Sequence, residues 1–199
     1  MNSSGNRVNV VLDSARSFSI DAKVAAEAGL HEGIELGEEQ LKQLQEADIF
    51  SRGLDSAITF LSYRARSQSE IRQKLHKLGF NNEIIVRVIE RLRDENLIND
   101  TSFAEYWKEN RIKSNYRSKN LIRYELIGKG IPRKIAFDTT NDLDDSSTAY
   151  KAGLKRARSL FSADCDEFHK RLSNYLKWRG FSYEVIHTVV EKLWTEKEK

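Results

Sequence analysis

Cysteine, proline and long apolar runs are scarce in this sequence, and each scarcity excludes a class of protein. Cys165 is the single cysteine among 199 residues, so the chain forms no internal disulfide. No stretch approaches the roughly 20 apolar residues that a membrane span needs. The N-terminus lacks the basic start and apolar core of a signal peptide. We therefore expect a soluble protein of the cytoplasm that has no membrane partner.

Signals for catalysis and for cofactor binding are also missing. The four histidines are scattered without the spacing of metal ligands, and no glycine-rich phosphate loop or nucleophile elbow occurs. Glu90 and Asp94 lie four residues apart, but a solvated helix face explains them most simply. The dense acidic run of Asp142, Asp144 and Asp145 resembles a loop that follows the end of a helix. We therefore expect no enzymatic activity, no metal and no cofactor.

Charge, in contrast, is abundant and unevenly distributed. Charged residues make up 32% of the chain and proline occurs once, which favours a helical protein. The net charge is −5 for residues 1–50, +8 for residues 51–135 and zero for residues 136–199. A basic middle indicates an anionic partner, either nucleic acid or an acidic protein surface.

A pattern of apolar residues and glycine occurs three times, at spacings of 51 and 50 residues. Each copy has an amphipathic helix, a glycine at its end and a second amphipathic helix, which together need a third helix to bury their apolar faces. The glycine and the first and last core positions after it are Gly79, Ile84 and Leu92, then Gly130, Ile135 and Leu143, then Gly180, Val185 and Leu193. We predict a mainly all-α fold of three tandem three-helix repeats, at residues 51–100, 101–145 and 146–199, that form an elongated curved array.

Residues 1–50 predict a small extension of these repeats. Residues 7–12 and 17–20 have the composition of two strands joined by a turn at residues 13–16, and Asp21 is placed to cap a short helix. A hairpin with two short helices is too small for a sizeable core of its own. We therefore expect the extension to lean on the repeats.

The sequence also suggests where helices begin. We expect the second helix of the extension to start after Gly37, a break at Gly53, and a new helix capped by Asp55. The second repeat is expected to start at a cap formed by Asp100 or Ser102. The repeats then contain nine helices in total.

The strongest candidate for a functional site is a basic run at residues 111–123, where five cations occur without an intervening acid. Such groups can contact phosphates, while the interleaved Tyr116 and Tyr124 offer stacking faces for bases. A solvated helix end and linker would explain the same residues without any function. The basic run consists of Arg111, Lys113, Arg117, Lys119 and Arg123, and is extended by Lys129, Arg133 and Lys134. A second cluster consists of Arg64, Arg66, Arg72, Lys74 and Lys77.

One further segment runs from Tyr63 to Trp107, YRARSQSEIRQKLHKLGFNNEIIVRVIERLRDENLINDTSFAEYW. It combines a basic residue before Ser-x-x-Glu-Ile-Arg-x-Lys-Leu, a Gly-Phe pair, an Ile/Val-rich helix, a Leu-Ile-Asn-Asp turn and Phe-Ala. This combination resembles the signature region of the RecX family, regulators of the RecA recombinase. The similarity continues through GKGIP and RGFSYEVI, over roughly residues 55–194, and residues 1–50 are similar to the hairpin extension of some members.

The resemblance implies a non-enzymatic modulator that lies in the groove of the RecA filament on DNA, spans neighbouring subunits and suppresses strand exchange, ATP hydrolysis and co-protease activity. It also implies that some members bind DNA directly. We therefore expect the RecA filament and single- and double-stranded DNA as partners of a monomeric chain that acts in DNA repair, the SOS response and homologous recombination. The chief alternative is a stand-alone helical-repeat DNA-binding protein that competes for DNA. From charge, we assign the contact to Arg111, Lys113, Tyr116, Arg117, Lys119, Arg123, Lys129, Arg133, Arg66, Arg72 and Lys74.

Overall fold

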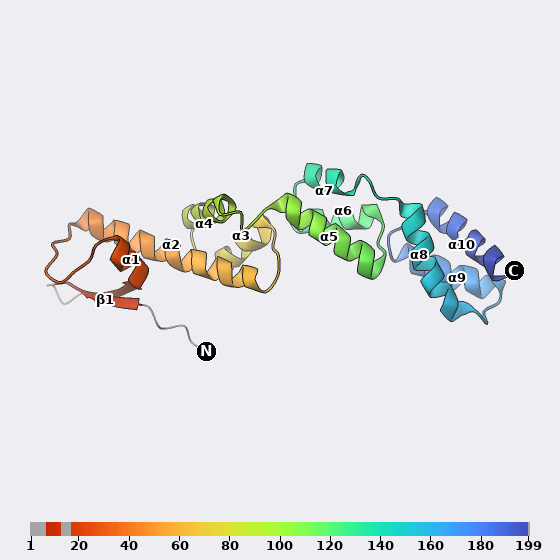
Figure 1. The fold of residues 1–199 in the computed structure, drawn as a ribbon, viewed down its shortest axis with the longest axis horizontal. Coiled ribbons are helices and arrows are strands. Elements are labelled where there is room, and N and C mark those ends of the chain that lie inside the picture. The colour runs from red at the N-terminus through yellow and green to blue at the C-terminus, as the bar shows by residue number, and fades with distance from the viewer. Residues whose placement is uncertain (1–6, 13–16, 199) are drawn as a thin grey trace. The chain divides into compact units, whose positions relative to one another are not determined.

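The computed structural model describes residues 7–12 and 17–198, and helices account for most of them (Figure 1). Ten α-helices and a two-stranded antiparallel hairpin occur within the described residues. The predicted class, mainly α-helical with a small N-terminal hairpin, is therefore confirmed.

The chain divides into two compact units. The first contains the described residues up to Arg66 together with Glu70–Leu97. The second contains Ser67–Ser69 together with Ile98 and the residues that follow it. The finer division into an extension and three repeats remains a prediction, although the helices described below follow its order.

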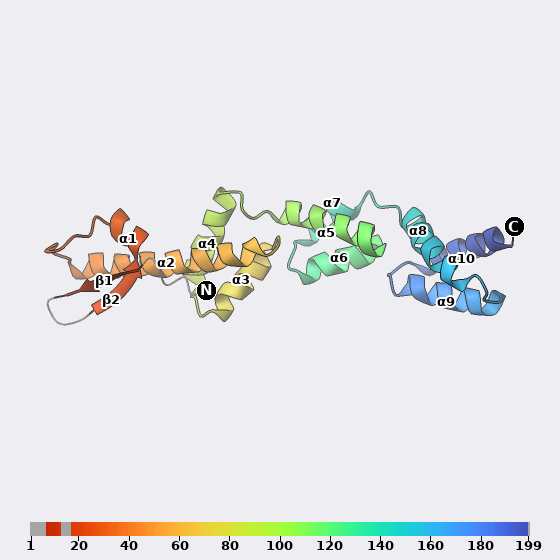
Figure 2. The same ribbon diagram turned by 60° about the horizontal axis from the view of Figure 1, so that its bottom comes forward.

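The N-terminal hairpin has the predicted topology. Strand β1 (Arg7–Val11) pairs antiparallel with β2 (Ser17–Asp21), and helix α1 (Ala22–Glu27) follows directly. The Asp21 side chain accepts a backbone hydrogen bond in the first turn of α1, as predicted for a cap. Figure 2 shows the two strands beside α1 and the start of α2. The predicted turn at residues 13–16 lies outside the described residues.

Helix α2 (Glu38–Ser62) is a single helix of 25 residues, so the predicted break at Gly53 and the predicted cap at Asp55 are wrong. Gly53 is present because α4 packs closely against α2 at this point. A Cβ atom on Gly53 would lie 3.2 Å from Cγ2 of Val88 and 3.4 Å from Cγ2 of Ile84. A glycine that permits close packing resembles a helix break in the sequence, and only the neighbouring helix distinguishes the two.

Eight further α-helices complete the described chain, and each second helix of a three-helix group ends at a glycine corner. Gly79, Gly130 and Gly180 have φ angles of 85°, 77° and 82°, the left-handed conformation predicted for them. We call α5–α7 the second repeat and α8–α10 the third repeat. The helices are α3 (Gln68–Lys77), α4 (Asn82–Asp94), α5 (Asp100–Asn115), α6 (Lys119–Gly128), α7 (Arg133–Thr140), α8 (Asp145–Ala157), which a short 3₁₀ turn (Arg158–Leu160) extends, α9 (Cys165–Lys177) and α10 (Tyr183–Lys197).

The second and third repeats bury equivalent positions after their corners. The buried positions of the second repeat include Ile131, Ala136, Thr139 and Thr140. The positions 50 residues further along are buried in the third repeat: Phe181, Ile186, Val189 and Val190. The repetition in the sequence therefore reflects a repeated packing arrangement.

The start of α5 differs from the prediction, and the start of α8 changes how the acidic run is interpreted. Asn99 caps α5, because its side chain accepts a hydrogen bond from the Ser102 backbone N–H at 3.0 Å, so neither Asp100 nor Ser102 is the cap. Helix α7 ends at Thr140, and Asp144 caps α8. The acidic run therefore lies mainly at the start of α8, where the helix dipole favours negative charge, and not at the unfavourable end of α7.

Candidate nucleic-acid interface

The second and third repeats meet at a polar joint around Ser118, a fully buried serine that caps α6. Its hydroxyl donates to the Gly180 carbonyl oxygen at 2.7 Å, and its backbone N–H donates to the Arg179 carbonyl oxygen at 3.0 Å. The next N–H, that of Lys119, donates to the Asp145 carboxylate at 2.8 Å. Segments that are some 60 residues apart in the sequence are therefore held side by side.

The carboxylate in this joint has an altered acidity. Burial raises the pKa of the Asp145 carboxyl above its ordinary value, because desolvation disfavours the charged form. The hydrogen bond from the Lys119 N–H and the nearby positive charges act in the opposite direction but only partly offset burial.

A second joint of the same construction occurs where residues 67–69, which belong to the second unit, reach the corner of the second repeat. The buried Ser67 hydroxyl donates to the Lys129 carbonyl oxygen at 2.6 Å. The Gln68 backbone N–H donates to the Asp100 carboxylate at 2.9 Å. A buried serine and an aspartate thus recur at equivalent places of the two joints.

Part of the basic run is fixed within the second repeat by Glu125. Its carboxylate accepts from Trp107 Nε1 at 2.7 Å and from Arg111 Nε at 2.6 Å, and it also forms an ion pair with Arg117. The Arg111 guanidinium and the Lys129 ammonium lie 4.0 and 4.3 Å from the centre of the Trp107 ring. One carboxylate therefore serves two guanidinium groups, so Arg111 and Arg117 are held against the fold while the cluster keeps a net positive charge. This acid was not part of the predicted site, because it lies just beyond the acid-free run.

The other cations of the second repeat differ in how freely they meet solvent. Arg123 is held by a hydrogen bond from its Nε to Thr140 Oγ1 at 2.7 Å. The Lys113 side chain is 75% exposed, and it forms an ion pair with the exposed Glu109 at 2.9 Å. Arg133 is exposed at the start of α7. Lys113 and Arg133 are thus better placed than Arg123 to contact an external phosphate.

The tyrosines near the basic run also divide into inward and outward ones. Tyr116 ends α5 in a left-handed conformation, with φ of 48°, and packs against the core of the third repeat. Tyr124 is 80% exposed. Two further exposed aromatic residues were not predicted as site residues: Trp178 and Tyr183, which are 87% and 80% exposed in the third repeat. Both lie in a segment that was interpreted only through the repeat pattern and the family resemblance.

The second basic cluster lies in the first unit, around the ring of Phe60. The Arg66 guanidinium lies 3.8 Å from the centre of this ring, and the Lys74 ammonium lies 5.9 Å from it. Arg72 is exposed on α3. As in the second repeat, some cations pack on an aromatic ring while others face solvent.

Comparison with known proteins identifies the family. The model of the first three-helix domain of RecX matches residues 54–92. The regulatory protein RecX of Clostridium perfringens strain SM101 is 31% identical over 193 residues, which cover 94% of this chain and 90% of that protein. The chain belongs to the RecX family. A RecX of Listeria innocua is 36% identical over 90% of this chain and 68% of its own length.

Solved structures of the family have the same fold. The crystal structure of a regulatory protein RecX matches 93% of this chain and 94% of its own, with a TM-score of 0.74 and 25% identity. RecX from Lactobacillus salivarius matches 74% of this chain and 97% of its own, with a TM-score of 0.65 and 27% identity. The chain accordingly has the regulatory role of the RecX family. The family-model match spans the end of α2, α3 and most of α4, whereas the basic run lies outside it.

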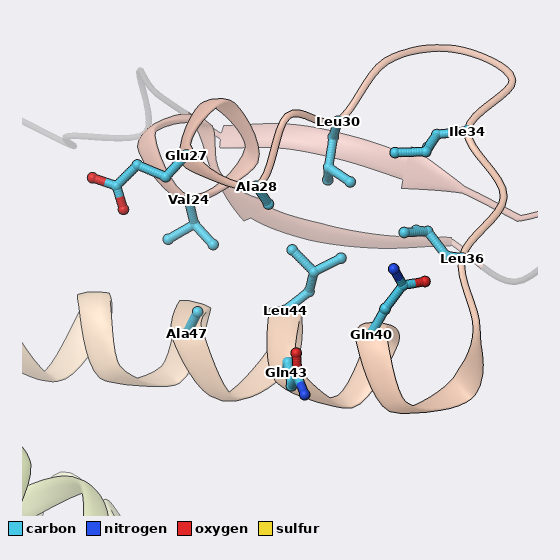
Figure 3. A pocket seen from close by; sticks show the side chains of 10 residues that line it. All are labelled: Val24, Glu27, Ala28, Leu30, Ile34, Leu36, Gln40, Gln43, Leu44 and Ala47. Carbon is cyan, nitrogen blue, oxygen red and sulfur yellow. The ribbon is translucent and has the colours of Figure 1, made fainter.

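A pocket of about 380 Å³ lies in the N-terminal extension, between α1, the following loop and α2 (Figure 3). Apolar side chains point into it, among them Leu30, Ile34, Leu36 and Leu44. Glu27 is the charged residue of its lining, so the pocket does not belong to the basic surface.

Two features are absent from residues 7–12 and 17–198. No group of three or more histidine, cysteine or acidic side chains is arranged to hold a metal ion in this part of the chain. No helix among the same residues is both long enough and apolar enough to cross a membrane.

Proposed function

We propose that this RecX-family protein is a non-enzymatic regulator that binds the RecA–DNA filament and inhibits its recombinase, ATPase and co-protease activities. The observation that carries the proposal is the match to proteins named regulatory protein RecX over nearly the whole chain, with 31% identity. The proposal includes a monomeric chain that acts in the cytoplasm, in DNA repair, the SOS response and homologous recombination.

The charged surface of the second repeat supports a contact with the DNA of the filament. Lys113 and Arg133 are exposed, and Lys119 starts α6 beside the joint. Flexible ammonium and guanidinium groups on a folded scaffold suit phosphate contacts that depend little on sequence. Arg111 and Arg117, which Glu125 holds, more directly position α5 against α6. We propose a smaller contribution to the contact from six further residues: Tyr116, Arg123, Lys129, Arg66, Arg72 and Lys74.

A second candidate function is that of a stand-alone DNA-binding protein that inhibits RecA only by occupying DNA. The same cations favour it, because they require no protein partner. The two functions differ in stoichiometry. A regulator of the filament acts when it is far too scarce to cover the DNA, whereas a competitor acts only near saturation.

The test is RecA-catalysed ATP hydrolysis on single-stranded DNA with this protein added in substoichiometric amounts, while its DNA binding is followed in parallel at two salt concentrations. The proposal expects hydrolysis to fall while most of the DNA is still free of this protein. Hydrolysis that falls only as the DNA becomes saturated would support the competitor. Hydrolysis that does not change at any ratio would contradict both.

A matched pair of variants tests the contact residues. Lys113→Gln combined with Lys119→Gln removes two charges at the proposed contact, and Lys151→Gln combined with Lys155→Gln removes two exposed charges from α8. The first pair is expected to lower the slope of log affinity against log salt on single-stranded DNA by about 1.4, or roughly 0.7 for each lost phosphate contact. The second pair is expected to leave the slope unchanged. Equal slopes for the two pairs would refute the assignment.

A further inference from the structure

Two aromatic side chains flank the glycine corner of the third repeat without packing into it. Trp178 follows the last residue of α9 and Tyr183 is the first residue of α10, and both are among the most exposed large side chains of the described chain. Tryptophan is highly buried on average, because its large ring gains much from leaving water. An exposed tryptophan and an exposed tyrosine on the two sides of one corner therefore indicate a binding surface more than a requirement of the fold.

The second repeat shows that the fold does not require these aromatic residues. The residues at the equivalent positions, 50 residues earlier, are Gly128 and Arg133. The second repeat nevertheless forms the same corner, with Gly130 in the same left-handed conformation as Gly180. The aromatic pair is thus an addition of the third repeat to a corner that already folds without it.

The joint between the second and third repeats places this pair beside the basic run. The carbonyl oxygen of Arg179, the neighbour of Trp178, accepts the Ser118 backbone N–H at 3.0 Å, so the corner touches the start of α6. Lys119 follows Ser118 there, and Lys177 precedes Trp178 and is exposed. The corner that carries the two rings therefore adjoins cations of both repeats along the backbone.

The backbone that presents the rings is held firmly. The Arg179 side chain donates from Nε to the Asn115 carbonyl oxygen at 3.1 Å, and its guanidinium lies 3.6 Å from the centre of the Tyr175 ring. A Cβ atom on Gly180 would lie 2.8 Å from Cβ of Leu121, which shows how closely the corner approaches α6. A rigid platform loses little entropy when a ligand binds to it.

We propose that this corner, residues 177–183, binds single-stranded DNA: Trp178 and Tyr183 stack on unpaired bases while Lys119 and Lys177 contact the phosphates. The inference deepens the DNA contact proposed above and rests on it. Exposed aromatic faces beside cations are the arrangement with which proteins bind single strands. A duplex keeps its bases stacked on one another, so it offers the rings no base faces. Glu184, the exposed acidic neighbour of Tyr183, disfavours a phosphate at the start of α10.

The test measures direct binding of a fluorescent oligothymidylate of about 15 nucleotides, and of a duplex of equal length, without RecA. Trp178→Leu keeps an apolar side chain but removes the stacking face, and Phe161→Leu changes an equally isolated ring, 77% exposed, elsewhere in the third repeat. Trp178→Leu is expected to weaken single-strand binding by roughly 5- to 150-fold, as for the loss of one stacked base. The salt slope and the duplex affinity are expected to stay unchanged, and Phe161→Leu should bind as the wild type does.

A spectroscopic readout tests stacking itself. The chain has three tryptophans, so Trp107→Phe combined with Trp194→Phe leaves Trp178 as the sole indole. Its emission is expected to be quenched when the oligothymidylate binds, and unchanged emission at saturation would overturn the inference. Circular dichroism confirms beforehand that this variant is folded.

The outcomes separate this inference from the proposed function. If the wild type and Trp178→Leu bind the oligonucleotide equally, the corner is not the single-strand site. The proposal that the protein inhibits RecA would still stand. If Trp178→Leu loses inhibition of RecA but keeps its DNA affinity, the corner contacts protein and the inference is overturned. If the wild type binds no DNA alone, both this site and the DNA contact on which it rests fall, and the ATPase assay still decides the regulatory function.

Discussion

Replacement of Ser118 by alanine should weaken the joint between the second and third repeats. The serine hydroxyl accepts the Leu121 backbone N–H at 3.2 Å and thereby caps α6. It also donates to the Gly180 carbonyl oxygen at 2.7 Å. Loss of the cap costs about 1 kcal/mol, and loss of the second hydrogen bond costs about another 1 kcal/mol. We expect a total of about 2 kcal/mol, a change of roughly 30-fold in the local opening equilibrium.

Ser182 provides the matched control. It caps α10 by accepting the Val185 backbone N–H at 3.4 Å, and it lies exposed to solvent. A long, exposed capping hydrogen bond contributes little to stability compared with other N-caps, so Ser182→Ala should cost about 0.5 kcal/mol. The two variants make the same chemical change at the same helix position, and they differ in the contact between repeats.

Native-state hydrogen exchange is the appropriate assay, because it measures local opening without assuming that two compact units unfold together. In Ser118→Ala, protection should fall by about 2 kcal/mol at the start of α6 and at the corner near Gly180, while amides within α10 change less. In a urea titration, the midpoint of unfolding should fall more for Ser118→Ala than for Ser182→Ala. Equal losses in Ser118→Ala and Ser182→Ala would refute the reasoning, because the bond between repeats would then contribute nothing.

Three other predictions follow from single contacts. Glu125→Leu should destabilise the second repeat by about 2–3 kcal/mol in a urea titration, because it leaves two partly buried guanidinium groups without their carboxylate. Glu109→Leu removes an exposed ion pair and should change the free energy of unfolding little. Asp145→Asn should gain stability relative to the wild type as the pH rises from about 3.5 to 7. The pKa of the Asp145 carboxyl is higher in the folded than in the unfolded wild type, so the wild type loses stability as the pH rises above the unfolded-state pKa, and the asparagine does not. A stability difference that stays constant across this pH range would contradict the prediction. Gly53→Val should destabilise the protein by about 1–3 kcal/mol, because the new side chain would press against α4. Gly128→Ala should stabilise α6 by about 0.4–1 kcal/mol, because no atom lies within 4 Å of the new Cβ. Thermal unfolding followed by circular dichroism measures both changes.

Local rules predicted much of the fold. The left-handed glycines at 79, 130 and 180 and the buried stripe after each were recognisable because helix periodicity and the conformational freedom of glycine act within a few residues. The same rules failed at Gly53, where a helix continues because a neighbouring helix needs the space, and at the start of α5, where several polar residues compete for one cap.

The candidate site was predictable in its charge but not in its arrangement. The sequence by itself determined the helical class, the tandem repetition, the basic middle and the resemblance to the RecX family. Only the tertiary structure decided that Glu125 pairs with both Arg111 and Arg117, and that the corner containing Trp178 touches the start of α6. The physical reason is range: periodicity and capping join residues within one or two helical turns, whereas an ion pair between helices or a serine bound some 60 residues away exists only once the helices pack.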